Sequence, residues 1–129
     1  MRSVTYYAPT MKDISISEMP PYGPTENEGY WAQDLQILNK HGLHARPSAR
    51  IFEKILQPYG GGLELHFDIH GGESVAINSI FDLMSLGLEQ GTGLTARIKY
   101  TDESEVEGEI VEHKIAKDLH DLFIEFCED

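Results

Sequence analysis

The feature that most restricts the fold is an unbroken alternation of residues over 63–70, LELHFDIH. The apolar positions are Leu63, Leu65, Phe67 and Ile69, and the polar positions between and after them are Glu64, His66, Asp68 and His70. Successive side chains of a β-strand point to opposite faces, so this stretch is predicted to be a strand with one wet face. Strands of this kind are typical of antiparallel sheets that are covered on one side only.

Other stretches of the chain supply the remaining elements of such a sheet. Strand patterns occur at 31–38, at 73–77 after the Gly71-Gly72 turn, and at 93–100, GLTARIKY, with Leu94, Ala96, Ile98 and Tyr100 inward. Helical spacing occurs ahead of Pro58 and Gly60–Gly62, in IFDLMSLGL after Asn78-Ser79, and in Ile115, Leu119, Leu122, Phe123 and Phe126. The order strand, helix, strand, strand, helix, strand, helix predicts an α+β open sandwich with an antiparallel sheet. Residues 101–111 fit either a loop or an extra strand, because Gly108 interrupts a long helix.

The first thirty residues differ from the rest, since they contain four of the six prolines and the segment PPYGP. Proline removes a backbone donor and breaks regular elements. We therefore expect residues 1–30 to form a loosely ordered Pro/Tyr-rich extension and residues 31–129 to form one domain. Tyrosines in the extension leave open a second interpretation, an arm that binds a partner or forms a dimer.

The charge balance restricts the partners. Ten Lys and Arg against 22 Asp and Glu give a formal net charge of −12, which disfavours nucleic acid and anionic membranes. The single cysteine, Cys127, fits a reducing compartment. The chain has neither a long apolar run nor a secretory leader pattern, so a soluble, cytoplasmic protein is expected. Any phosphate site on this chain has to be locally positive.

One short stretch, Gly42-Leu43-His44-Ala45-Arg46-Pro47, carries recognisable chemistry. Proline favours the first turn of a helix, which places His44 at the helix N-terminus. That end of a helix carries partial positive charge and binds anions, and Arg46 adds a forked donor suited to phosphate oxygens. A neutral imidazole is a nucleophile near neutral pH. These local features also fit a histidine that only caps a helix beside a solvated arginine.

Metal binding and independent catalysis have weaker support. His41 and His44 have the HxxH spacing, but two ligands do not make a structural zinc site, so no metal and no cofactor are expected. His66 and His70 are predicted on the wet strand face, and His113 and His120 on the last helix. The sequence contains no P-loop and no dinucleotide-binding fingerprint.

Two separated motifs resemble a known family. NKHGLHARPSA resembles the active-site motif of HPr, the histidine phosphocarrier of the bacterial phosphoenolpyruvate:sugar phosphotransferase system. NSIFDLMSLGLEQGTGLT is similar to that family's short second helix and following strand, so the resemblance covers roughly 31–100. It implies an HPr-like βαββαβα sandwich with a four-stranded antiparallel sheet and helices on one face.

The resemblance also implies roles for individual residues. His44 would accept a phosphoryl group on Nδ1 from enzyme I, assisted by Arg46, and pass it to an enzyme IIA. Ser79 matches the position that an HPr kinase/phosphorylase modifies in some members, although a serine there is also an ordinary helix cap. Ile80, Phe81 and Met84, with Arg50, match a docking patch, and a core position is an alternative for each apolar residue. The chain would then be a phosphoryl carrier rather than an independent enzyme.

Some residues depart from the family pattern. Glu53, Asn78 and Asp82 stand where relatives often carry lysines, which bears on the choice of partner. An alternative function is therefore a regulatory phosphohistidine or a docking module, in a nitrogen-type or transport-free relay that acts on a regulator instead of on sugar uptake.

Overall fold

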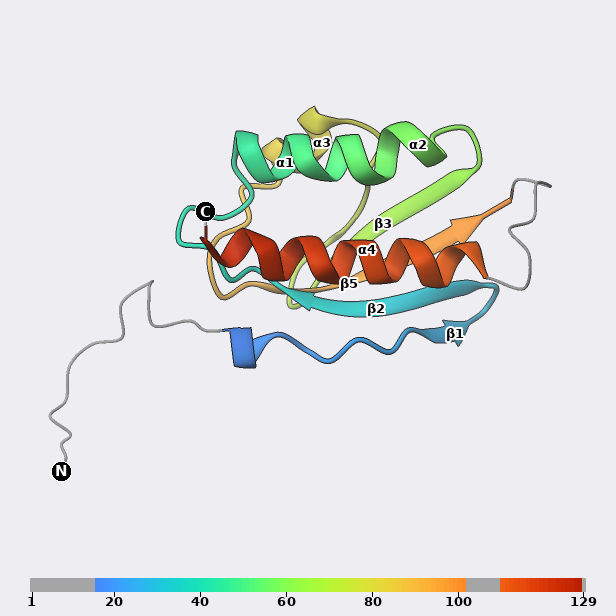
Figure 1. Cartoon of the computed structure of the whole chain (residues 1–129), viewed down its shortest axis with the longest axis horizontal. Coiled ribbons are helices and arrows are strands. Elements are labelled where there is room, and N and C mark those ends of the chain that lie inside the picture. The colour runs from blue at the N-terminus through green and yellow to red at the C-terminus, as the bar shows by residue number, and fades with distance from the viewer. Residues whose placement is uncertain (1–15, 102–109, 129) are drawn as a thin grey trace, which may run out of the picture.

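The structure, a computed structural model, describes residues 16–101 and 110–128. It contains one antiparallel sheet with the strand order β1-β2-β5-β3-β4. Helices cover one face of this sheet, and the other face is open (Figure 1). The strands are β1 (Thr25–Asn27), β2 (Tyr30–Gln36), β3 (Leu63–Ile69), β4 (Ser74–Ala76) and β5 (Gly93–Tyr100). The α+β class and the one-sided sandwich are thus confirmed.

The sheet has five strands, so the expectation of four is corrected. The fifth is β1, which pairs with β2 from Asn27 opposite Tyr30 to Thr25 opposite Ala32. The two residues between these strands, Glu28 and Gly29, both have positive φ, 53° and 91°. A two-residue loop of this kind matches the twist of an antiparallel hairpin. The strand TEN is too short and too polar to show any alternation, which is why the sequence pattern did not reveal it.

The alternation over 63–70 appears in the structure as predicted. Leu65 and Phe67 are buried, whereas Glu64 and His70 are exposed. Strand β5 lies between β2 and β3 and buries Leu94, Ala96 and Ile98. The period of two therefore identified both strands and the face that each one buries.

Helical residues 45–59 form one continuous run made of α1 (Ala45–Ile51), a π-helical stretch η3 (Phe52–Leu56) and α2 (Gln57–Tyr59). The run ends just before the glycines at 60–62, and Pro58 lies in its last turn. The other helices are α3 (Ile80–Ser85), α4 (Val111–Glu125) and the short 3-10 turns η2 (Ile16–Glu18) and η4 (Phe126–Glu128). The predicted apolar stripe is buried in the core, with Ile115, Leu119, Leu122 and Phe123 on α4 and Phe126 at the start of η4.

Residues 19–24, here called the strap, lie along the sheet edge and α4 ahead of β1. Met19 is buried, the Pro20 carbonyl lies 2.7 Å from His120 Nε2, and the Tyr22 hydroxyl donates to the His113 carbonyl. Burial raises the pKa of the Tyr22 hydroxyl, and Lys117 opposes that effect. The division of the chain at Tyr30 stays a prediction, and residues 1–15 and 102–109 lie outside the described part of the chain.

Candidate functional site

His44 is the N-cap of α1, as the sequence predicts. Its backbone is extended, with φ −87° and ψ −165°, and its carbonyl accepts from the Ser48 N–H at 3.1 Å. No side-chain hydrogen bond caps the helix here, so His44 does not act as a conventional cap through its ring. The first turn that follows, Ala45-Arg46-Pro47, presents the N-terminal end of a helix that continues to Tyr59.

The loop before His44 is pinned to a second loop. Gly42 has φ +70°, and the carbonyl of Leu88 occupies the space where a Cβ on residue 42 would stand. The same Leu88 carbonyl accepts the N–H of Leu43 at 3.1 Å. The amide of Asn39, which is 1% exposed, donates to the Gly42 carbonyl. These contacts give His44 a defined backbone position.

The two ring nitrogens of His44 differ in environment. The ring is half-buried, and Nε2 is buried without a hydrogen-bond partner among the described residues. A reactant approaching from solvent is therefore shielded from Nε2.

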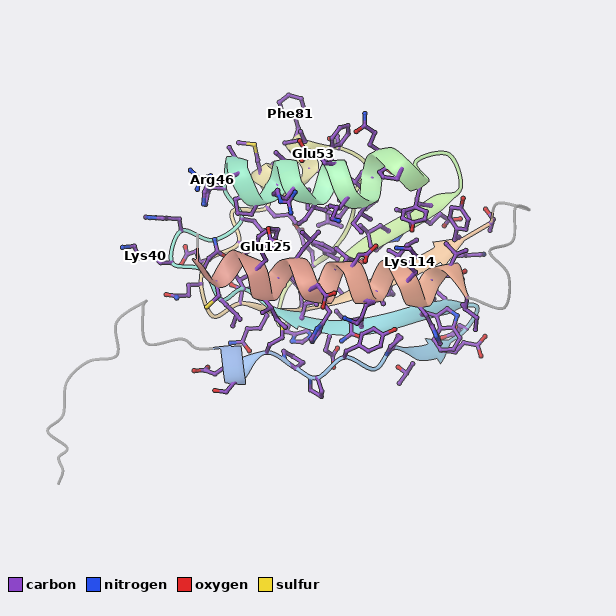
Figure 2. The ribbon with its side chains drawn as sticks, in the orientation of Figure 1. Lys40, Arg46, Glu53, Phe81, Lys114 and Glu125 are labelled. Atoms are coloured by element: carbon purple, nitrogen blue, oxygen red, sulfur yellow. The ribbon has the colours of Figure 1, made fainter. Side chains whose placement is uncertain are left out.

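Positive side chains lie at the end of the molecule that carries His44. Arg46 is exposed on the first turn of α1, and Lys40 is exposed on the preceding loop. Figure 2 shows both at the end of the molecule where α1 begins. The site thus has cations close to His44, although the whole chain is strongly acidic.

Arg50 has carboxylate partners that the sequence did not reveal. Its guanidinium contacts both carboxylate oxygens of Glu125 on α4, the shortest distance being 3.0 Å from Nη2 to Oε2. Glu53 lies 3.9 Å away on the same helix. Because 75 residues separate Arg50 from Glu125, no local pattern indicates this pair. The positive charge of Arg50 is therefore largely balanced by carboxylates of this chain before any partner binds.

His41 also lies beside His44. The centroids of the two rings are 5.8 Å apart and their planes make an angle of 86°, an edge-to-face contact. In the sequence, His41 stands out only by its HxxH spacing with His44. Within the described residues, no group of three or more His, Cys, Asp or Glu side chains is arranged to hold a metal ion.

Ser79 is the N-cap of α3. Its hydroxyl accepts the Asp82 N–H at 3.2 Å, and the Asp82 carboxylate accepts the Ser79 N–H at 3.1 Å. The arrangement is a capping box, in which each residue satisfies a backbone donor of the other. Asp82 also accepts the Asn78 N–H, at 2.7 Å.

The three apolar residues after Ser79 take different positions. Phe81 is 79% exposed and Met84 is 43% exposed, whereas Ile80 is partly buried. Figure 2 shows Phe81 on the outer side of the helical layer, pointing away from it. Helix α3 packs against α1, so this apolar surface adjoins the helix that begins at His44. A core position is thereby excluded for Phe81 and Met84.

Comparisons with known proteins agree with this geometry. Residues 32–113 match the family model described as the PTS HPr component phosphorylation site. The chain is similar to a phosphocarrier protein HPr of Haemophilus influenzae, with 34% identity over 67% of this chain and 92% of that protein. It is also similar to a phosphocarrier protein HPr of Buchnera aphidicola, with 35% identity over 54% of this chain and 76% of the relative. No helix within the described ranges is long and apolar enough to span a bilayer. The chain belongs to the HPr family, the phosphocarriers of the phosphotransferase system.

Proposed function

We propose that His44 is the residue that carries the phosphoryl group. The observation that carries this proposal is the burial of Nε2 in a ring that stands at the start of a helix. Attack through Nδ1 requires its lone pair to be free, so the ring proton has to sit on Nε2. The fold thereby favours one nitrogen as the nucleophile.

The transfer step uses groups of this chain in a simple way. The Nδ1 lone pair attacks the phosphorus of a phosphohistidine on the donor protein and forms a new P–N bond. The P–N bond of the donor breaks, and its electron pair returns to the donor imidazole. Passing the group onward is the same step in reverse, with His44 as the leaving group. The carrier needs no cofactor for either step.

The surroundings of His44 suit a phosphoryl group that has to move on. The helix N-terminus contributes about 0.3–1 kcal/mol to an exposed anion. Arg46, exposed on that first turn, supplies a fork of donors for phosphate oxygens. We assign Arg46 to stabilising the phosphate in transit. Modest stabilisation holds the group without trapping it.

The donor and recipient follow from the same proposal. Enzyme I, charged by phosphoenolpyruvate, is the proposed donor, and an enzyme IIA is the proposed recipient. Ile80, Phe81 and Met84 form the apolar centre of the proposed docking surface, and the exposure of Phe81 supports it. We assign Arg50 to the same surface, and its pairing with Glu125 and Glu53 lowers its attraction for an acidic partner. Both phosphoryl transfers are proposed to take place in the cytoplasm.

Ser79 is a candidate for modification by an HPr kinase/phosphorylase. A phosphate on its hydroxyl would stand beside the Asp82 carboxylate, which already accepts two backbone N–H groups. Like charges at that distance repel each other. The phosphate would also stand at a helix N-terminus, which favours an anion, so α3 need not be disrupted, but the added charge would weaken docking next to Phe81.

The test is phosphorylation by the enzyme I of the same organism with radiolabelled phosphoenolpyruvate. The chain is expected to acquire acid-labile phosphate, and ³¹P NMR is expected to place it on Nδ1 of His44. His44→Ala removes the label, whereas His66→Ala, on the open sheet face, keeps it. Equal labelling of His44→Ala, or label that is stable to acid, contradicts the proposal.

The recipient is tested separately. Labelled chain is mixed with a sugar-specific enzyme IIA and, in a parallel reaction, with a nitrogen-type IIA. Rapid loss of label to the first supports service in sugar uptake. Transfer only to the second supports the alternative, in which the phosphohistidine controls a regulator.

A further inference from the structure

The most informative feature that the proposed function leaves unexplained is a second imidazole beside His44. His41 is exposed, and its ring meets that of His44 edge-to-face, with 5.8 Å between the ring centroids. Histidine is the side chain whose ordinary titration changes its charge between about pH 5 and 8. A group of variable charge thus stands next to the proposed phosphoryl carrier.

Hydrogen bonds fix the backbone of the turn that carries His41. The Gly42 N–H donates to the Asn39 carbonyl at 3.2 Å, which closes a turn around residues 40 and 41. The Asn39 amide returns a hydrogen bond to the Gly42 carbonyl, and Leu88 blocks movement of Gly42 from the other side. These contacts fix the backbone of residue 41, and with it the point from which the His41 side chain extends.

The other charges around this loop are of fixed sign near neutral pH. The charged residues nearest to it are Lys40 on the loop itself, Arg46 on the first turn of α1 and Glu89, whose backbone lies beside Gly42. Glu125 is engaged by Arg50. His41 is therefore the neighbour of His44 whose charge varies most across this range of pH.

We propose that His41 is a positioning residue that makes retention of the phosphoryl group on His44 depend on pH. The inference rests on the proposed function. A protonated His41 attracts the phosphate oxygens and holds the group on His44, whereas a neutral His41 does not. The proton comes from solvent, and no covalent bond forms between His41 and the phosphoryl group. The carrier then gives up its phosphoryl group more readily above neutral pH than a carrier with a permanent cation at position 41.

The test compares two variants with the full-length chain. His41→Gln removes the titratable charge, His41→Lys makes the charge permanent, and His66→Gln is the matched control on the open sheet face. Each chain is labelled by enzyme I and freed of it, and the first-order loss of phosphate is followed from about pH 5.5 to 8. Thermal unfolding of each variant verifies that the chain is folded.

The rate of phosphate loss from His41→Gln is divided by the rate for the unaltered chain at each pH. This ratio is expected to rise about threefold to tenfold as the pH falls through the range, because an attraction between charges near the surface is of that size. The His41→Lys ratio is expected to be near one at the low end of the range, where both chains carry the charge, and to fall below one as the pH rises and only the unaltered chain loses it.

If both His41 variants are labelled normally and their ratios of loss rates do not change with pH, this inference is overturned and the carrier function is left intact. A chain that enzyme I does not label at all overturns the carrier function, and the inference with it. A change of equal size in His66→Gln shows a general effect of net charge and likewise refutes the assignment to His41.

Discussion

The carbonyl oxygen of Leu88 stands where a side chain on Gly42 would have to begin. This contact joins the loop that leads into α1 to the loop that follows α3, two segments that are distant in sequence. Leu43 strengthens the junction, because its N–H donates to the same carbonyl. His44 comes directly after the junction, so the position of its ring depends on a glycine two residues earlier.

Gly42→Ala is expected to destabilise the fold and displace His44. The substitution combines a strained backbone at φ +70° with a clash against the Leu88 carbonyl, together at least about 2 kcal/mol. Urea unfolding measures the loss, and the labelling rate with enzyme I measures the displacement. Gly87→Ala is the matched control, since Gly87 has φ +59° but nothing within 4 Å of its Cβ position. Equal losses in the two variants would show that strain alone, and not the contact with Leu88, is responsible.

Phe81→Ala is expected to slow phosphoryl transfer without lowering stability. The ring is 79% exposed, so its removal forfeits little burial within the chain. Leu83 on the same helix is fully buried, and Leu83→Ala is expected to cost about 2–5 kcal/mol. The measurements are the rate of labelling at several enzyme I concentrations and the midpoint of urea unfolding. An unchanged labelling rate for Phe81→Ala would show that α3 is not part of the surface that docks with enzyme I.

Ser79 and Asp82 are expected to contribute to stability as a coupled pair. Removing either side chain breaks the capping box and costs about 1 kcal/mol. The double variant Ser79→Ala/Asp82→Ala should cost less than the sum of the single losses, because each residue caps the other. A double-mutant cycle by urea unfolding measures the coupling. Strict additivity would mean that the two hydrogen bonds act independently.

The parts of the fold that the sequence predicts are those that depend on local periodicity. The alternation over 63–70 identified β3 and its buried face, and Pro47 after His44 identified the start of α1. Strand β1 was missed because three polar residues carry no period. The partners of Arg50 and of Gly42 were missed for another reason: Glu125 and Leu88 lie far along the chain, and folding alone brings them together.

The pairing of Arg50 with Glu125 is expected to matter more for partner choice than for stability. Both side chains are partly exposed, so the pair contributes at most about 1 kcal/mol. Glu125→Gln frees the guanidinium and should raise the rate of association with an acidic partner, with a steeper dependence on salt. The exposed pair Lys117–Asp121 offers a control, and Asp121→Asn is expected to leave the salt dependence of labelling nearly unchanged. The same salt dependence in Glu125→Gln and the unaltered chain would count against a role for Arg50 in docking.

Gln33 is expected to hold the strap against the sheet. Its side chain is 1% exposed, its Oε1 accepts the Gly23 N–H at 3.0 Å, and its Nε2 donates to the Pro21 carbonyl at 3.1 Å. Gln33→Ala leaves these backbone groups without their partner and is expected to cost about 1–3 kcal/mol. Hydrogen exchange of the Gly23 amide should accelerate in this variant, whereas Gln36→Ala, at the other end of β2, should leave that amide protected. A Gly23 amide that exchanges equally fast in all three chains would show that the strap is held by Met19 and His120 instead, because their contacts with the domain do not involve Gln33.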